Sequence, residues 1–374
     1  MTMTRRPALP ILLGLALVLG ACGKKGPLLP PVSRVPQAPD NIRIYQQGAQ
    51  LMIEWTNPQS YVDGTPLGPV AETEIWVWEP PAGEEAAATP PSEREMSKRG
   101  RLEKRLSAED MESQKRPESA AAEVPVYRYV RPLDEGEIGT PAKAYALRAR
   151  DQRRRPSQFS KPAAFEARVL PLPPRKPAAK VFEDQVEITW QAPESYIDGK
   201  KPVKVSGYNV YKMDDAGVWR RLTDKPGTTL QYKDGPPVFG RPVRYIVRAV
   251  LSVPQVPQRF LESGDSEILE LTPEDVFPPA APEGLTSVSG RGFISISWLP
   301  NREKDLKGYR VWRRAEKETD FRLLTSDPIP QAVFMDEEVK PGRAYVFAVA
   351  AVDNAGNTSP RTELAVESDK DAPR

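Results

Sequence analysis

Alternating apolar and polar positions recur three times along the chain, each time ending in a tryptophan. The three segments are residues 51–55, 186–190 and 294–298, which end at Trp55, Trp190 and Trp298. Alternation with a period of two is typical of a strand with one buried face. A proline follows two or three residues later in every copy, and the first two copies continue with an Asp-Gly turn pair.

Each copy then contains two further alternating segments. The second is 74–78, 207–211 or 308–312, and the third opens with Tyr145, Tyr245 or Tyr345. A buried Trp on an early strand with a Tyr at the start of a late strand is the packing signature of an antiparallel sandwich with a tyrosine corner. These copies resemble fibronectin type III domains, the third most closely through residues 340–345 and 353–359. The resemblance implies an all-β chain of three tandem immunoglobulin-like sandwiches, expected at residues 38–170, 174–273 and 278–368.

The first copy contains an insertion, because Trp55 to Tyr145 spans 90 residues against 55 and 47 in the other copies. The extra residues fall in 80–123, which holds ten acidic and eight basic residues and few large apolar ones. This composition predicts a mobile, solvated loop. A partner-docking helix over 93–112, with Leu102 and Leu106 four residues apart, is the alternative. Proline-rich segments at 170–177 and 277–282 connect the copies, and 369–374 forms a polar tail.

The N-terminus has the layout of a secretory signal. Arg5 and Arg6 precede an apolar core at 11–19, and small residues at 19–21 precede Cys22, which is the single cysteine of the chain. This segment, 1–21, resembles a bacterial lipoprotein signal, and the resemblance implies cleavage before Cys22 and acylation of that residue. Several acyl chains, at about 0.8 kcal/mol per buried methylene, hold a protein firmly to a membrane. A plain secretory signal that leaves Cys22 unmodified is the alternative.

Residues 22–31 also resemble the C-G-x-K-G-P-L-x-x-P start of small outer-membrane lipoproteins, one of which is associated with lipopolysaccharide transport. Gly23 stands where inner-membrane lipoproteins have Asp, which favours an outer-membrane address. We expect 22–37 to be a flexible tether. Loss of 1–21 leaves 51 basic and 51 acidic residues, and a neutral chain gives no electrostatic reason to expect nucleic acid as a partner.

Composition argues against catalysis and against cofactors. The 374 residues include no His, which removes the commonest general base and metal ligand, and one Cys cannot form an intrachain disulfide or a Cys-rich zinc site. The Asp-rich turn at 353–357 lacks the glutamate that an EF-hand calcium loop has at its twelfth position, so we expect a turn and no metal site. No nucleophile elbow or phosphate-binding loop is present.

Binding is therefore expected at surface aromatic residues and loops. If Val77, Val210 and Val311 are core residues, the alternation turns neighbouring aromatic side chains outward, where they could stack on sugars or anchor a protein. The alternative is that these aromatic side chains only cover their own sheet or lie under the 80–123 insertion. Loops at 252–267 and 151–156 could also carry recognition. The candidate binding residues are Trp76, Trp78, Tyr211, Trp312, Phe260, Arg153, Arg154 and Arg155.

The sequence thus predicts a non-catalytic interaction or scaffold protein, lipid-anchored in the cell envelope with an envelope protein as partner. Glycan binding or adhesion through the outward aromatic residues is the second hypothesis, and an unrecognised hydrolase is the third.

Overall fold

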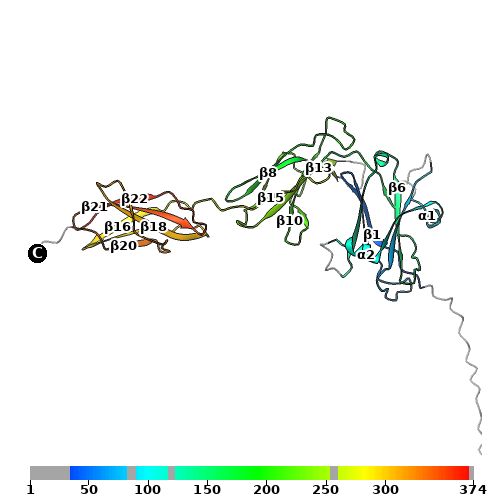
Figure 1. The fold of residues 1–374 in the computed structure, drawn as a ribbon, viewed down its shortest axis with the longest axis horizontal. Coiled ribbons are helices and arrows are strands. Elements are labelled where there is room, and N and C mark those ends of the chain that lie inside the picture. Colours follow the sequence, from blue (N-terminus) through cyan, green and yellow to red (C-terminus); the bar gives the residue numbers. More distant parts are fainter. Residues whose placement is uncertain (1–33, 82–89, 117–122, 253–259, 370–374) are drawn as a thin grey trace, which may run out of the picture. The chain divides into compact units, whose positions relative to one another are not determined.

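The computed structural model describes residues 34–81, 90–116, 123–252 and 260–369. Cys22 and the rest of the predicted signal and tether up to residue 33 lie outside this range. The chain forms two compact units. The first holds the described residues of Met1–Arg43, Glu54–Arg128 and Ala142–Phe165, and the second those of Ile44–Ile53, Tyr129–Pro141 and Glu166–Arg374. Figure 1 shows the strands in sequence colours.

The strands follow one another in three repeats. In the first repeat, a four-stranded sheet has the order β4-β3-β6-β7, and β1, β2 and β5 are neighbours in a second sheet. The strands are β1 (Asp40–Gln47), β2 (Gln50–Thr56), β3 (Glu72–Trp78), β4 (Arg101–Ser107), β5 (Val126–Pro132), β6 (Lys143–Arg150) and β7 (Ala163–Phe165).

The second repeat has a three-stranded sheet of order β12-β9-β8 and strands β11-β10-β13, to which β14 and β15 are added. Its strands are β8 (Arg175–Val181), β9 (Val186–Gln191), β10 (Gly207–Met213), β11 (Trp219–Arg221), β12 (Gln231–Asp234), β13 (Val243–Ser252), β14 (Phe260–Glu262) and β15 (Leu269–Leu271).

The third repeat has sheets of order β16-β17-β20 and β19-β18-β21-β22. Its strands are β16 (Glu283–Gly290), β17 (Phe293–Leu299), β18 (Leu306–Ala315), β19 (Arg322–Leu323), β20 (Val333–Asp336), β21 (Ala344–Asp353) and β22 (Thr362–Glu367). The same strand order thus recurs in each repeat, and the expected fold class, all-β with tandem immunoglobulin-like units, is confirmed.

The tryptophans that end the alternating segments are core residues. Trp55, Trp190 and Trp298 are 0%, 6% and 5% exposed. The core clusters of the second and third repeats draw on both sheets, and in each the Trp packs edge-on against a tyrosine of the next strand. The partners are Tyr208 for Trp190 and Tyr309 for Trp298. Every second residue of these strands is buried, and the large aromatic side chains among them mark the faces of the sheets that point into the core.

The tyrosines that open the late strands are held in two different ways. In the third repeat the Tyr345 hydroxyl accepts a hydrogen bond from the Lys340 backbone N–H at 2.9 Å, as a tyrosine corner does. In the second repeat Tyr245 instead donates to the Asp234 carboxylate at 2.8 Å. Burial raises the pKa of Tyr245, and the hydrogen bond to Asp234 raises it further, so the hydroxyl stays protonated.

The insertion is not a solvated loop where the structure describes it, and a single helix over 93–112 is also wrong. Residues 90–116 form α1 (Glu93–Arg99), then the strand β4, then α2 (Ala108–Ser113). Ser92 and Ser107 each begin a helix with a reciprocal capping box. β4 pairs antiparallel with β3 and takes the edge position that β11 and β19 take in the other repeats. The insertion is therefore part of the sheet.

Three apolar residues hold this segment to the first unit. Met96 of α1 is fully buried, and Leu106 of β4 and Met111 of α2 are each 3% exposed. The Met111 sulfur accepts hydrogen bonds from the Asn57 amide at 3.3 Å and the Thr73 hydroxyl at 3.1 Å. Charge density alone predicted disorder, but three well-placed apolar side chains and one strand pairing are enough to order the segment.

Within the second unit, the end of β1 pairs with β14 of the second repeat. Gln47 pairs in parallel with Glu262, and the Gly48 N–H donates to the Glu262 carbonyl at 2.9 Å. Gly48 has φ +56°, and a Cβ there would lie 2.6 Å from the Gly264 nitrogen. Only glycine satisfies both the left-handed backbone and this close approach.

No helix in the described ranges has the length and apolar character to cross a membrane.

Candidate functional site

The outward aromatic side chains lie on the outer faces of the three sheets that contain β3, β10 and β18. Ile75, Val210 and Val311 are buried core residues at matching positions of β3, β10 and β18. Because strand neighbours point to opposite sides, the residues next to them line the outer face. These are Glu74 and Trp76 in the first repeat, Asn209 and Tyr211 in the second, and Arg310 and Trp312 in the third. We call these surfaces outer face 1, outer face 2 and outer face 3.

On outer face 1, helix α1 covers the tryptophans. Trp78 is only 3% exposed and shares an apolar cluster with Met96, Phe159 and neighbouring alanines, against which Trp76 packs half-buried. The Trp76 ring meets Phe159 edge-on at 5.5 Å. The Glu93 carboxylate, in the first turn of α1, accepts from the Phe159 N–H at 3.1 Å and so secures the helix. Trp76 and Trp78 therefore lie under the inserted segment, as the alternative prediction had it, and do not form an open stacking platform.

A buried carboxylate forms ion pairs with three arginines of this face. The Glu74 side chain is 0% exposed and contacts Arg105, Arg148 and Arg150 at 3.2, 2.6 and 2.8 Å. Burial by itself would raise the pKa of Glu74, but hydrogen bonds from Arg150, Arg148 and the Trp76 indole lower it from 4.5 to about 2. Glu74 therefore stays ionised and serves as a structural counter-ion.

On outer face 2, Tyr211 lies beneath a similar network. Its hydroxyl donates to Glu262 at 2.7 Å, and Asn209 donates to the same carboxylate. The Arg248 guanidinium lies 4.3 Å from the Tyr211 ring centre and pairs with Glu262 and Asp265. Burial raises the pKa of Tyr211, and the charge of Glu262 raises it further. Tyr211 is thus engaged by its own chain.

On outer face 3, Trp312 is 9% exposed and lies over Ala348 and Ala350. The Arg361 guanidinium carbon lies 4.2 Å from the Trp312 ring centre and 5.6 Å from that of Phe321. On this face Arg361 stacks on the Trp312 ring and is itself exposed to solvent.

In the predicted recognition loop at 151–156, most of the arginine side chains bind to residues of the same chain. Arg155 pairs with the buried Asp151 at 2.6 Å and lies over Tyr61, while Arg154, at φ +60°, reaches Glu72 at 3.4 Å. The Arg153 N–H donates to Asp151, and its side chain is exposed. Two of the three arginines therefore hold the turn together.

Two other predicted residues fall partly or wholly outside the described chain. Cys22 lies in the undescribed N-terminal segment. Phe260 begins β14, but its side chain and residues 253–259 of the predicted recognition loop are outside the described part. Leu261, next to Phe260, is 7% exposed and packs with Leu170 and Leu251.

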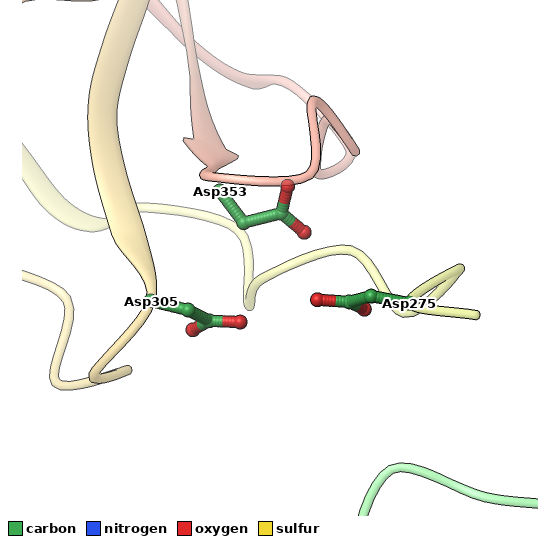
Figure 2. Close-up of side chains that lie close together, drawn as sticks. All are labelled: Asp275, Asp305 and Asp353. Carbon is green, nitrogen blue, oxygen red and sulfur yellow. The ribbon is translucent and has the colours of Figure 1, made fainter. Parts of the chain in front are cut away.

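A cluster of three carboxylates was not predicted from the sequence. Asp275, Asp305 and Asp353 each offer an oxygen within 4.8 Å of the others (Figure 2). Asp353 is fully buried, and its carboxylate accepts from the Asn357 N–H and side-chain amide at 2.8 and 2.9 Å. Oxygen ligands of this kind suit hard cations such as Ca²⁺. Sequence reasoning found only the 353–357 turn, because Asp275 and Asp305 come from distant segments.

Comparisons with known proteins match parts of this chain. An amylopullulanase of Thermoanaerobacterium thermosulfurigenes is 29% identical over 110 residues, which are 29% of this chain and 5% of that protein. Exoglucanase B of Cellulomonas fimi is 27% identical over 203 residues, which are 52% of this chain and 16% of that protein. The chain thus spans a small fraction of these curated relatives. No protein-family model matches it.

Two solved structures share low sequence identity with it. A two-domain fibronectin type III segment from chicken tenascin is 13% identical, with a TM-score of 0.33, over 52% of this chain and 99% of that one. The FN1–FN3 domains of chicken CNTN1 are 17% identical, with a TM-score of 0.25, over 90% of this chain and all of that one.

Proposed function

We propose that this chain is a lipid-anchored, non-catalytic scaffold or interaction protein of the cell envelope, with an outer-membrane address. Tandem fibronectin type III-like domains are consistent with a scaffold or adhesion module. The observation that carries the proposal is this tandem of β repeats behind a signal-like segment that ends at the single cysteine, Cys22.

The electrostatics of three carboxylates, those of Glu74, Asp151 and Asp234, fit a structural role for these groups. A general acid or base works best with a pKa near the operating pH. The pKa of Glu74 is moved away from that range, to about 2, and the pKa of Asp151 and of Asp234 is also lowered. The three carboxylates accept hydrogen bonds from Arg or Lys side chains of the same chain, so Glu74 and Asp234 stabilise sheets and Asp151 stabilises the turn that follows β6.

Carbohydrate association is the second candidate function, and the partial matches to amylopullulanase and exoglucanase B favour it. The matched stretches cover only 5% and 16% of those enzymes. Because Met96 and its neighbours cover Trp78, a glycan would have to bind elsewhere than on outer face 1. Retention of the chain on insoluble starch or cellulose, measured against bovine serum albumin, tests this candidate.

Membrane fractionation tests the anchor. Cys22→Ser removes the single thiol that can be acylated, so we expect the protein to leave the membrane fraction of its native host. Gly23→Asp is the matched variant, because it keeps the thiol and changes only the address: it should stay membrane-bound and move to the inner membrane. Cys22→Ser protein that remains processed and membrane-bound would show that lipid does not anchor this chain.

Co-purification from detergent-solubilised membranes tests the scaffold role. After chemical cross-linking in cells, a defined envelope protein should be recovered with the wild-type chain and lost with Cys22→Ser. Recovery of saccharide in place of protein would support the second candidate.

A further inference from the structure

The three outer faces share one arrangement, in which an arginine guanidinium stacks over an outward aromatic ring. The three pairs are Arg148 with Trp76 at 5.1 Å, Arg248 with Tyr211 at 4.3 Å, and Arg361 with Trp312 at 4.2 Å. Each ring directly follows a buried core residue, so the three positions are equivalent. Differences in what surrounds these pairs can therefore be compared directly.

In the first two repeats a glutamate of the chain completes the pair. Arg148 bonds to Glu74 at 2.6 Å, and Arg248 bonds to Glu262 at 3.0 Å. The two glutamate side chains are 0% and 19% exposed. The stacked guanidinium thus faces a carboxylate that is largely removed from water, where charge-assisted hydrogen bonds are strong.

Outer face 3 lacks this carboxylate. Among the described residues, no acidic side chain pairs with Arg361 or with Arg310, which occupies the position that Glu74 has on outer face 1. The Nε atom of Arg310 is buried and has no hydrogen-bond partner in the described chain. Glu363 lies on the same face, but its ion pair is with Arg314, at 3.9 Å. A buried donor left without an acceptor costs about 1 to 3 kcal/mol, and an acceptor brought by a partner would remove this cost.

Arg314 already has hydrogen-bond acceptors within the chain, so only Arg310 and Arg361 remain to bind an external acceptor on outer face 3. Its Nη1 atom donates to the carbonyls of Glu316 and Glu318, both at 3.0 Å, and its guanidinium lies 5.2 Å from the Phe321 ring centre. Within the part of the chain that the structure describes, Arg310 and Arg361 have no such hydrogen bonds. They flank Trp312, Arg310 two residues before it on β18 and Arg361 over its ring.

We propose that outer face 3 binds a glutamate side chain of an acidic partner segment, with its carboxylate between Arg310 and Arg361 beside Trp312. This rests on the proposed interaction function and names the chemistry of the partner. The other two repeats show that a glutamate carboxylate satisfies this arrangement, and three arginines against one glutamate give the face a positive potential that attracts an acidic segment.

Peptide binding to the purified full-length chain in detergent tests the proposal. The probe is a fluorescein-labelled peptide of alternating Glu and Ser, followed by fluorescence anisotropy at low salt. We expect binding to the wild type and at least tenfold weaker binding to the double variant Arg310→Gln/Arg361→Gln. Arg361→Lys, which keeps the charge but loses the planar stack, should fall between them.

Matched controls separate the site from general charge. Arg291→Gln removes one exposed charge from the β16–β17 turn of the same repeat and should change affinity less than twofold. A Gln-Ser peptide should not bind. Near-ultraviolet circular dichroism shows whether each variant keeps its fold.

Two outcomes would overturn the proposal. The first is equal affinity of the folded double variant and the wild type. The second is stronger competition by polygalacturonate than by the peptide at equal carboxylate concentration, which would assign the face to an acidic saccharide. Since the assay uses purified protein, its failure is distinct from failure of the anchor, which fractionation of Cys22→Ser reports, and from failure of the scaffold role, which cross-linking reports.

Discussion

Replacement of Glu74 by Gln should destabilise the first repeat by several kcal/mol without changing its shape. The Glu74 carboxylate is fully buried and contacts three guanidinium groups, those of Arg105, Arg148 and Arg150. Glutamine has the same size but no charge. Arg105 and Arg150 would keep their ion pairs with Glu72, at 2.9 and 3.5 Å, but Arg148 would face a neutral amide, which can satisfy fewer guanidinium donors than a carboxylate.

The pKa of Glu74 gives the magnitude. A fall from 4.5 to about 2 on folding corresponds to roughly 3 kcal/mol of stabilisation by the ionised form. Mutation data on buried ion pairs give a similar figure, since loss of one partner costs about 3 to 5 kcal/mol. We therefore expect Glu74→Gln to lower the free energy of unfolding of the first repeat by about 3 kcal/mol at pH 7.

The same reasoning fixes the pH dependence. Because the folded-state pKa is depressed, the stabilisation is fully present above about pH 4.5 and is lost as the pH falls through about 2. Protonation of Glu74 removes its negative charge from the wild type, just as the substitution by Gln removes it from the variant. The difference between the two proteins should therefore shrink to less than half of its pH 7 value by about pH 3.

Urea titration followed by fluorine NMR of fluorotryptophan-labelled protein measures this difference for one repeat at a time. Trp55 and Trp78 report on the first repeat, and Trp190 and Trp298 report on the others. Glu79→Gln is the matched control, because Glu79 is 61% exposed and pairs with Lys143. An exposed pair contributes less than about 1 kcal/mol. A difference that is the same at pH 7 and pH 3, or no larger than that of the control, would refute the counter-ion role.

Three further predictions concern packing and backbone. Met96→Ala should cost about 2 to 5 kcal/mol in the first repeat, whereas Met335→Ala, at a 51% exposed side chain, should cost less than about 0.5, both measured by urea titration. Trp298→Ala should lower the unfolding free energy of the third repeat by about 3 to 5 kcal/mol, and an unchanged urea midpoint would contradict its core position. Gly48→Ala should destabilise the protein more than Gly292→Ala. Both positions need a left-handed backbone, but only at Gly48 would a backbone nitrogen lie 2.6 Å from the added Cβ. Equal melting temperatures of the two variants would count against this.

Local sequence predicted those features that depend on one strand. Alternation placed Trp190 and Trp298 in the core and turned Tyr211 and Trp312 to the opposite face, and the structure confirms these orientations. Strand side chains alternate wherever the strand is paired, so five consecutive residues carry this information.

Features that depend on distant partners could not be predicted in this way. Glu262 lies 51 residues from the Tyr211 that it contacts, and Asp275 lies even farther from Asp353. The order of the insertion could not be predicted from local sequence for the same reason. Its charges suggested disorder, but the burial of Met96 depends on Trp78 and Phe159 of the sheet it joins.

The three ways of covering an outer face also bear on how these repeats can evolve or be recombined. Outer face 1 is closed by an inserted helix and outer face 2 by a glutamate from β14, whereas on outer face 3 an arginine next to β22 stacks on the aromatic ring. A strand moved from one repeat to another would leave its covering group behind. Transfer of β10 into the third repeat, for example, would bring Tyr211 without Glu262. Despite their common strand order, the repeats are therefore not interchangeable modules, and a working chimera would have to exchange each aromatic strand together with the residues that cover it.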